Sequence, residues 1–87
     1  MNTIKFCLDC YDWKQADKDT MLKTLAELGF KIDDYGSVVF AEYKGDKLNA
    51  IVNHESFTGK LYIAIFDDPN ETLLKIPQKR ISAIYCL

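Results

Sequence analysis

The spacing of apolar residues changes within the first thirty positions of this chain, from every second residue to every third or fourth. Ile4–Tyr11 alternates between apolar residues and mostly polar ones, which predicts a strand with one buried face. The apolar spacing from Met21 to Leu28 predicts a helix with Asp17 as its N-cap and Gly29 as its C-terminal cap. A strand and an amphipathic helix bury their apolar surfaces together, so we expect a helix packed on a sheet.

The remainder of the chain is rich in residues that favour strands. The predicted strands are 37–43, 48–53, 61–66 and 80–86. An acidic turn at 33–36 precedes them, and a tight hairpin at 44–47 and a longer connection at 53–60 join the first three as a meander. The order Asp-Pro-Asn-Glu at 68–71 predicts a short helical turn, which Pro77 would end.

These elements predict one small α+β domain that covers residues 1–87. We expect a mostly antiparallel sheet of about four to five strands with one main helix packed on one face, in the order β-α-β-β-β-(short α)-β. An 87-residue chain has room for a single core, which stabilises such a domain by only about 3 to 5 kcal/mol. The apolar run Val38–Ala41 suggests an exposed edge strand, through which the chain would form a homodimer or add a strand to a partner.

Charge and composition narrow the classes of function. No stretch approaches the roughly 20 apolar residues of a membrane span, and the N-terminus lacks the apolar core of a signal peptide, so we expect a cytoplasmic protein without a membrane partner. The net charge of −2 offers no basic face for nucleic acid. Three cysteines, an odd number, indicate reduced thiols rather than a disulfide framework.

Two cysteines form the one pattern typical of a metal site. Cys7 and Cys10 are a C-x-x-C pair, and His54 and Cys86 would complete a zinc site of three cysteines and one histidine. Zinc-binding pairs of this kind lie on tight turns, whereas an alternating strand sends these two side chains to opposite faces. We therefore expect no metal and no cofactor, with a structural zinc site as an alternative.

The single histidine, His54, is the side chain best suited to proton transfer near neutral pH. With Glu55 and Lys60 it could serve a small nuclease-like toxin. No second histidine and no nucleophile motif accompany it, so we expect no catalytic residues and a protein that is not an enzyme. The toxin enzyme remains the alternative hypothesis.

Aromatic and acidic residues gather after the first strand and in the acidic turn. They are Tyr11, Asp12, Trp13, Asp33, Asp34 and Tyr35. Tyrosine and tryptophan dominate binding energy at many interfaces, and acidic loops suit a basic target, so this set is the candidate partner-binding site. Equally, Trp13 could fold back over the start of the helix while the tyrosines cover the core.

The function we expect is that of a small acidic protein-binding module. Such a module would inhibit a larger protein by covering part of its surface, as immunity proteins, antitoxins and phage anti-defence proteins do. The similarity to those proteins is one of size and composition alone.

Overall fold

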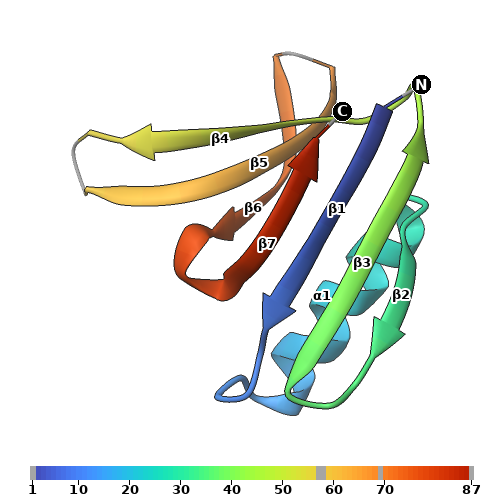
Figure 1. Ribbon diagram of the computed structural model, residues 1–87, viewed down its shortest axis with the longest axis vertical. Coiled ribbons are helices and arrows are strands. Elements are labelled where there is room, and N and C mark those ends of the chain that lie inside the picture. The colour runs from blue at the N-terminus through green and yellow to red at the C-terminus, as the bar shows by residue number, and fades with distance from the viewer. Residues whose placement is uncertain (1, 57–58, 69, 87) are drawn as a thin grey trace.

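Two antiparallel sheets and one helix make up the fold (Figure 1). The computed structural model describes residues 2–56, 59–68 and 70–86, and of these the side chains of residues 2, 55, 60 and 82–86 are outside the description. The elements are β1 (Asn2–Asp9), α1 (Gln15–Glu27), β2 (Lys31–Asp34), β3 (Val38–Gly45), β4 (Asn49–Glu55), β5 (Lys60–Asp68), β6 (Glu71–Pro77), the 3-10 turn η1 (Gln78–Arg80) and β7 (Ile81–Cys86). The first sheet has the strand order β2-β3-β1-β7, and the second sheet has the order β4-β5-β6.

The first strand, β1, alternates as its sequence predicts. Ile4, Phe6 and Leu8 are almost completely buried and belong to the hydrophobic core. Their partners on β3 include Val39 opposite Leu8 and Ala41 opposite Phe6, which are buried on the same face. This inner face of the first sheet is therefore continuous across its two central strands.

The helix α1 begins earlier than the sequence predicts. Its N-cap is Lys14 rather than Asp17, and Asp17 lies in the first turn, where its charge meets the positive end of the helix dipole. The side-chain amide of Gln15 donates to the carboxylate of Asp19 at 2.7 Å. This bond spans four residues and forms only when Gln15 is already helical, so it favours the earlier start.

The predicted C-terminal cap of α1 is confirmed. Gly29 has a φ of +98°, and the N–H of Phe30 donates to the carbonyl of Leu25 at 3.0 Å. Leu25 is fully buried, and the ring of Phe30 packs between those of Phe6 and Tyr43, with centroid distances of 5.6 and 5.7 Å. These contacts hold the C-terminal end of the helix against the inner face of the first sheet.

The acidic segment 33–36 is only partly a turn. Asp33 and Asp34 belong to β2, which pairs antiparallel with β3. The turn follows them, because the carboxylate of Asp34 accepts the N–H of Gly36 at 2.8 Å. Since β2 and β1 flank β3 on its two sides, the run Val38–Ala41 is not an edge, and that expectation is wrong.

The predicted single sheet of four to five strands is also corrected, because the predicted hairpin at 44–47 is the end of β3 and the start of a corner, residues 46–48, that leads to the second sheet. The N–H of Lys47 donates to the hydroxyl of Tyr43 at 3.3 Å, and Leu48 is buried in the core. A Cβ on Gly45 would lie 2.6 Å from that hydroxyl, so any other residue there would require the Tyr43 side chain to shift. Beyond the corner the strands of the second sheet cross those of the first (Figure 1).

The helical turn predicted at 68–71 is a turn between two strands. β5 continues to Asp68 and β6 begins at Glu71. The N–H of Asn70 donates to the carboxylate of Asp68 at 2.8 Å, so the predicted helix cap closes a side-chain turn instead. Pro69 lies outside the described residues.

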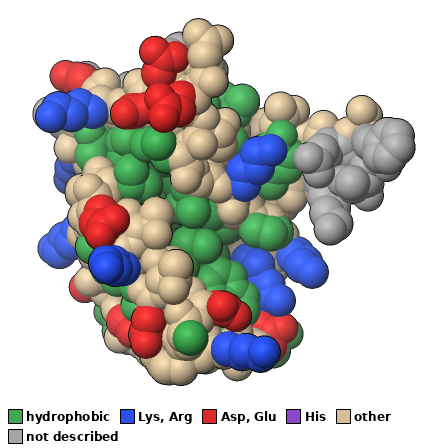
Figure 2. Space-filling view, turned by 180° about the vertical axis from the view of Figure 1, so that it is seen from behind, with side chains coloured by type: hydrophobic (Ala, Val, Ile, Leu, Met, Phe, Trp, Pro, Cys, Tyr) green, Lys and Arg blue, Asp and Glu red, His purple; other side chains and the backbone are tan. Residues whose placement is uncertain are grey.

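A single hydrophobic cluster joins the two sheets and the helix. Ile63 and Ile65 on β5 and Ile76 on β6 are fully buried and belong to the same cluster as Phe6 and Leu25. On the face seen in Figure 2, acidic and basic side chains are interspersed around apolar ones. Within the described ranges, no helix is long and apolar enough to cross a membrane.

Candidate functional site

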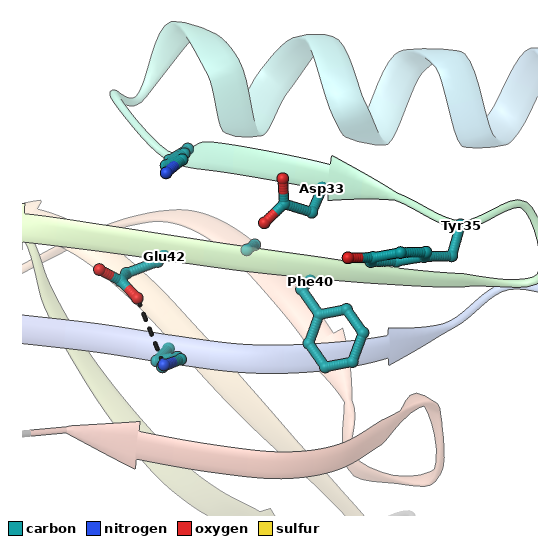
Figure 3. Close-up of a pocket in the computed structure, with 7 residues that line it drawn as sticks. Asp33, Tyr35, Phe40 and Glu42 are labelled. Carbon is teal, nitrogen blue, oxygen red and sulfur yellow. Dashed lines mark ion pairs between the residues drawn. The ribbon is translucent and has the colours of Figure 1, made fainter.

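The candidate site is the outer face of the first sheet, opposite to the face that carries the core. Lys5 lies opposite Glu42, and Asp33 lies opposite Phe40, in the register of the three strands β2, β3 and β1. Because side chains alternate along a strand, these four point away from the core-facing residues. With Lys31 and Tyr35 they border a shallow hollow with a volume of about 360 Å³ (Figure 3).

Two aromatic rings stand together at one end of this hollow. The rings of Tyr35 and Phe40 meet edge to face, with centroids 5.5 Å apart and planes at 89°. Tyr35 is 70% exposed and Phe40 is 44% exposed. The N–H of Tyr35 donates to the carbonyl of Val38 at 2.9 Å, which fixes the backbone that carries the first ring. The pair is therefore a positioned apolar group that faces solvent.

Charged groups of both signs occupy the other end of the hollow. The carboxylate of Glu42 lies 3.4 Å from the ammonium group of Lys5 and 3.4 Å from that of Lys44. The hydrogen bond from Lys44, and after it the one from Lys5, lowers the pKa of Glu42. Glu42 therefore stays ionised at neutral pH, and the hollow presents a mixed charge rather than an acidic one.

Two of the six predicted binding residues are held by Arg80. Its guanidinium group donates to both carboxylate oxygens of Asp12, with one bond of 3.0 Å, and lies 5.9 Å from the centre of the Trp13 ring. The hydrogen bond from Arg80 lowers the pKa of Asp12 and raises that of Arg80. Trp13 also packs against the core cluster, so its position matches the second of the two alternatives.

A third predicted residue, Asp34, faces the helix. The ammonium group of Lys18 on α1 donates to the carboxylate of Asp34 at 2.9 Å and to the carbonyl of Gly36 at 2.8 Å. The bond from Lys18, followed by the bond from the Gly36 N–H, lowers the pKa of Asp34. This carboxylate therefore fastens the turn after β2 to the helix and does not line the hollow.

The remaining predicted residues lie at one end of the first sheet. The N–H of Cys10 donates to the carbonyl of Ser37 at 2.9 Å, so the loop after β1 lies beside the turn between β2 and β3. Tyr11, 75% exposed, and Tyr35 are carried by these two neighbouring segments, and Asp33 lines the hollow. The structure thus brings together the two segments that carry the predicted residues, the loop after β1 and residues 33–35. The side chains of these residues point to different surfaces.

The sequence analysis missed Lys5, Lys31, Phe40 and Glu42. Each is an outward residue of a predicted or actual strand, and its neighbours in the chain are buried or, for Ile32 beside Lys31, partly buried. Phe40, Glu42 and Lys44 are spaced by two, so the two charged residues were a readable signal that Phe40 points away from the core.

The C-x-x-C cysteines do not face a common site. Cys10 belongs to the core cluster, whereas Cys7 is buried outside that cluster, on the opposite side of β1. Burial raises the pKa of the Cys10 thiol, which disfavours the thiolate that a metal would need. His54 lies in the other sheet, and the side chain of Cys86 is outside the described residues. The described part of the chain holds no group of three metal-binding side chains.

His54 lies in a strand rather than in the predicted loop. It is exposed near the end of β4, opposite Leu61 of β5, and its N–H bonds to the side-chain carbonyl of Asn53 at 2.8 Å. Glu55 and Lys60 face each other in the register of the same two strands. Their side chains are outside the described residues, so the acid–base set proposed for a toxin is not placed.

No protein-family model, curated protein or solved structure matches the chain significantly.

Proposed function

We propose that this chain is a non-enzymatic protein-binding module that inhibits a larger protein by covering part of its surface. The outer face of the first sheet is the binding surface, and the exposed pair Tyr35 and Phe40 is its centre. That pair carries the proposal, because aromatic side chains fixed by packing dominate the binding energy of many protein interfaces. Neither α1 nor the second sheet covers it, since both pack on the inner face.

The chemistry around the pair favours a protein partner over a nucleic acid. Lys5 and Lys31 alternate with Asp33 and Glu42 around the hollow, so its charge would oppose a continuous phosphate backbone at two positions. A protein surface can match such a pattern group by group. The hollow, at about 360 Å³, is large enough for one apolar side chain of the partner to reach the aromatic rings.

The inhibitory role rests on the small size of the module and on the nature of this surface. A domain of 87 residues that binds through one face of a sheet acts most simply by covering the surface of its partner. Immunity proteins, antitoxins and phage anti-defence proteins are the classes that we propose. The basic target expected earlier is no longer favoured, because Asp12 and Asp34 are paired within the chain.

Affinity capture from the host cytoplasm with matched variants tests the proposal. The tagged chain should retain a larger protein, and the double variant Tyr35→Ala, Phe40→Ala should bind that protein at least about 30-fold more weakly, which corresponds to about 2 kcal/mol. Leu73→Ala removes a similarly exposed apolar side chain from β6 of the second sheet and should leave the affinity within about twofold.

Unchanged binding by the folded double variant would contradict the proposed surface. A nuclease activity that His54→Ala abolishes would contradict the non-enzymatic role and support the alternative hypothesis.

A further inference from the structure

The edge strands of the two sheets differ in how they are protected against pairing with another strand. β2 is only four residues long and exposes Lys31 and Asp33. β6 exposes Glu71 and Lys75 and ends at Pro77. Short length, charge and proline are the usual means by which proteins prevent a sheet from growing at its edge. The side chains of most of β7 are outside the described residues.

The edge strand β4 carries none of these protections over residues 49–54, and its one acidic residue, Glu55, is the last residue of the strand. Residues 49–54 contain no acidic residue, no lysine or arginine, and no proline. Ile51 is 48% exposed and Val52 is 52% exposed, and as neighbours they lie on opposite faces of the strand. β4 pairs with β5 along its whole length, so on its other side every second residue turns its N–H and C=O outward. Figure 1 shows the β4–β5 hairpin projecting away from the first sheet.

We propose that β4 pairs in antiparallel orientation with β4 of a second copy of this chain, around a two-fold axis at Ile51. The five residues Asn49–Asn53 have the same order of polarity in both directions: polar, three apolar, polar. In this register Ile51 lies opposite its own copy, and the small Ala50 lies opposite the larger Val52. No like charges are opposed, so the strand complements itself without a partner of different sequence.

The symmetry of this arrangement is compatible with a continuous sheet. A two-fold axis perpendicular to the sheet reverses the strand direction and keeps each face of the sheet on the same side. The two Ile51 side chains then meet on one face, and the two pairs formed by Ala50 and Val52 lie on the other. The second sheets of both copies join in the order β6-β5-β4-β4-β5-β6, which removes both unprotected edges at once.

This pairing is independent of the proposed function. The hollow at Tyr35 and Phe40 belongs to the first sheet, whereas β4 belongs to the second. A dimer would carry two copies of the candidate binding face, but neither proposal requires the other. A variant at Ile51 and a variant at Tyr35 therefore separate the failure of one from the failure of the other.

Sedimentation equilibrium of the full chain, from about 1 µM to about 500 µM, measures the association. An interface made by one strand is small, so we expect a weak dimer in the upper part of this range. Ile51→Lys places two like charges at the axis and should raise the dissociation constant at least about tenfold. Leu73→Lys makes the same chemical change at an exposed position of β6, and it should leave the dissociation constant unchanged within about twofold.

Hydrogen–deuterium exchange of the unmodified chain gives a second test that does not depend on the folding of a variant. Exchange at residues 49–53 should slow as the concentration rises, while exchange in β2 should not change. A chain that stays monomeric throughout the concentration range overturns the proposal. The edge of β4 would then be available for pairing with a strand of another protein. Dimerisation without protection of 49–53, or with equal sensitivity to both lysine variants, overturns it as well.

Discussion

The two sheets contribute to the same core but leave different kinds of surface uncovered. The first sheet has a short, charged edge at β2, and its exposed apolar side chains, Tyr35 and Phe40, stand on a face among ion pairs. The second sheet has an edge strand, β4, in which residues 49–54 include no acidic residue, lysine or arginine, and in which Ile51 and Val52 are exposed. A face with fixed rings suits recognition of side chains, whereas an open edge suits pairing of strands. We therefore propose partner binding for the first sheet and self-association for the second.

The largest expected effect tests whether the two sheets are one cooperative unit. Phe6→Ala in the first sheet and Ile63→Ala in the second both open the shared cluster, and each should lower the free energy of unfolding by about 2 to 5 kcal/mol. Trp13 fluorescence and far-ultraviolet circular dichroism should report the same denaturation transition in each variant that remains folded. Val52→Ala, at an exposed site, should change the unfolding free energy by less than about 1 kcal/mol. Separate transitions for the two probes would show that the sheets unfold independently.

The corner between the sheets gives the next largest effect. Gly45→Ala would place a Cβ 2.6 Å from the Tyr43 hydroxyl, and overpacking of this kind costs about 1 to 3 kcal/mol of unfolding free energy. Tyr43→Phe removes the hydroxyl and its bond to the Lys47 N–H, at a cost of about 1 kcal/mol. In urea denaturation the double variant should lose less than the sum of the single losses, because the clash is relieved. If the losses of unfolding free energy were additive, the Tyr43 hydroxyl would not be the group that clashes with a Cβ at residue 45.

Lowering the pH should destabilise the chain chiefly through carboxylates in and beside the first sheet. The pKa values of Asp12, Asp34 and Glu42 are lowered in the folded chain by Arg80, Lys18 and Lys44, respectively. The unfolded chain therefore binds more protons, so the stabilisation is complete above the ordinary carboxyl pKa of about 4 and is lost as pH falls through the lowered values.

Thermal unfolding between about pH 2 and pH 7 measures this dependence. Asp34→Asn should make the melting temperature depend less on pH below about pH 4 than in the unmodified chain. Asp67→Asn, in β5, is the matched control, and it should leave the pH dependence close to that of the unmodified chain. If both substitutions reduced the pH dependence of the melting temperature equally, that dependence could not come from the ion pairs of the first sheet.

The smallest effect concerns the contact between Arg80 and the loop after β1. Arg80→Gln removes the ion pair with Asp12 and the cation above Trp13. Because the pair is exposed and screened by salt, only a slight fall in melting temperature is expected, together with a change in Trp13 fluorescence. Lys79→Gln, one residue away, should leave the fluorescence as it is. A Trp13 spectrum unchanged by Arg80→Gln would show that the core contacts alone position the ring.

Sequence patterns correctly predicted the features that depend on residues close together in the chain. The alternation around Phe6, the apolar stripe through Leu25 and the cap at Gly29 each depend on neighbours in sequence, and each is confirmed. The second sheet could not be predicted in this way. Residues 44–47 have the composition of a hairpin, but the burial of Leu48 in the core shared by both sheets directs the next strand into the second sheet.

The candidate site was predictable only in part. Its aromatic and acidic content was visible in the sequence, but the partners of Asp12 and Asp34 are Arg80 and Lys18, at separations that no local pattern reveals. Phe40 was missed because it stands in the apolar run Val38–Ala41, although its spacing of two from Glu42 indicated the outward face. The predicted residues thus lie at the correct end of the first sheet, but most of them do not lie on its outer face.

The hydrogen–deuterium exchange footprint of the captured partner on this chain tests the proposed binding face most directly. If the outer face binds the partner, exchange in β2 and in the turn at 35–37, next to Tyr35 and Phe40, should be slower when the partner is bound. Exchange in β5 and β6 of the second sheet should stay the same. A footprint confined to the second sheet, with the first sheet unaffected, would contradict the assignment of partner binding to the outer face of the first sheet.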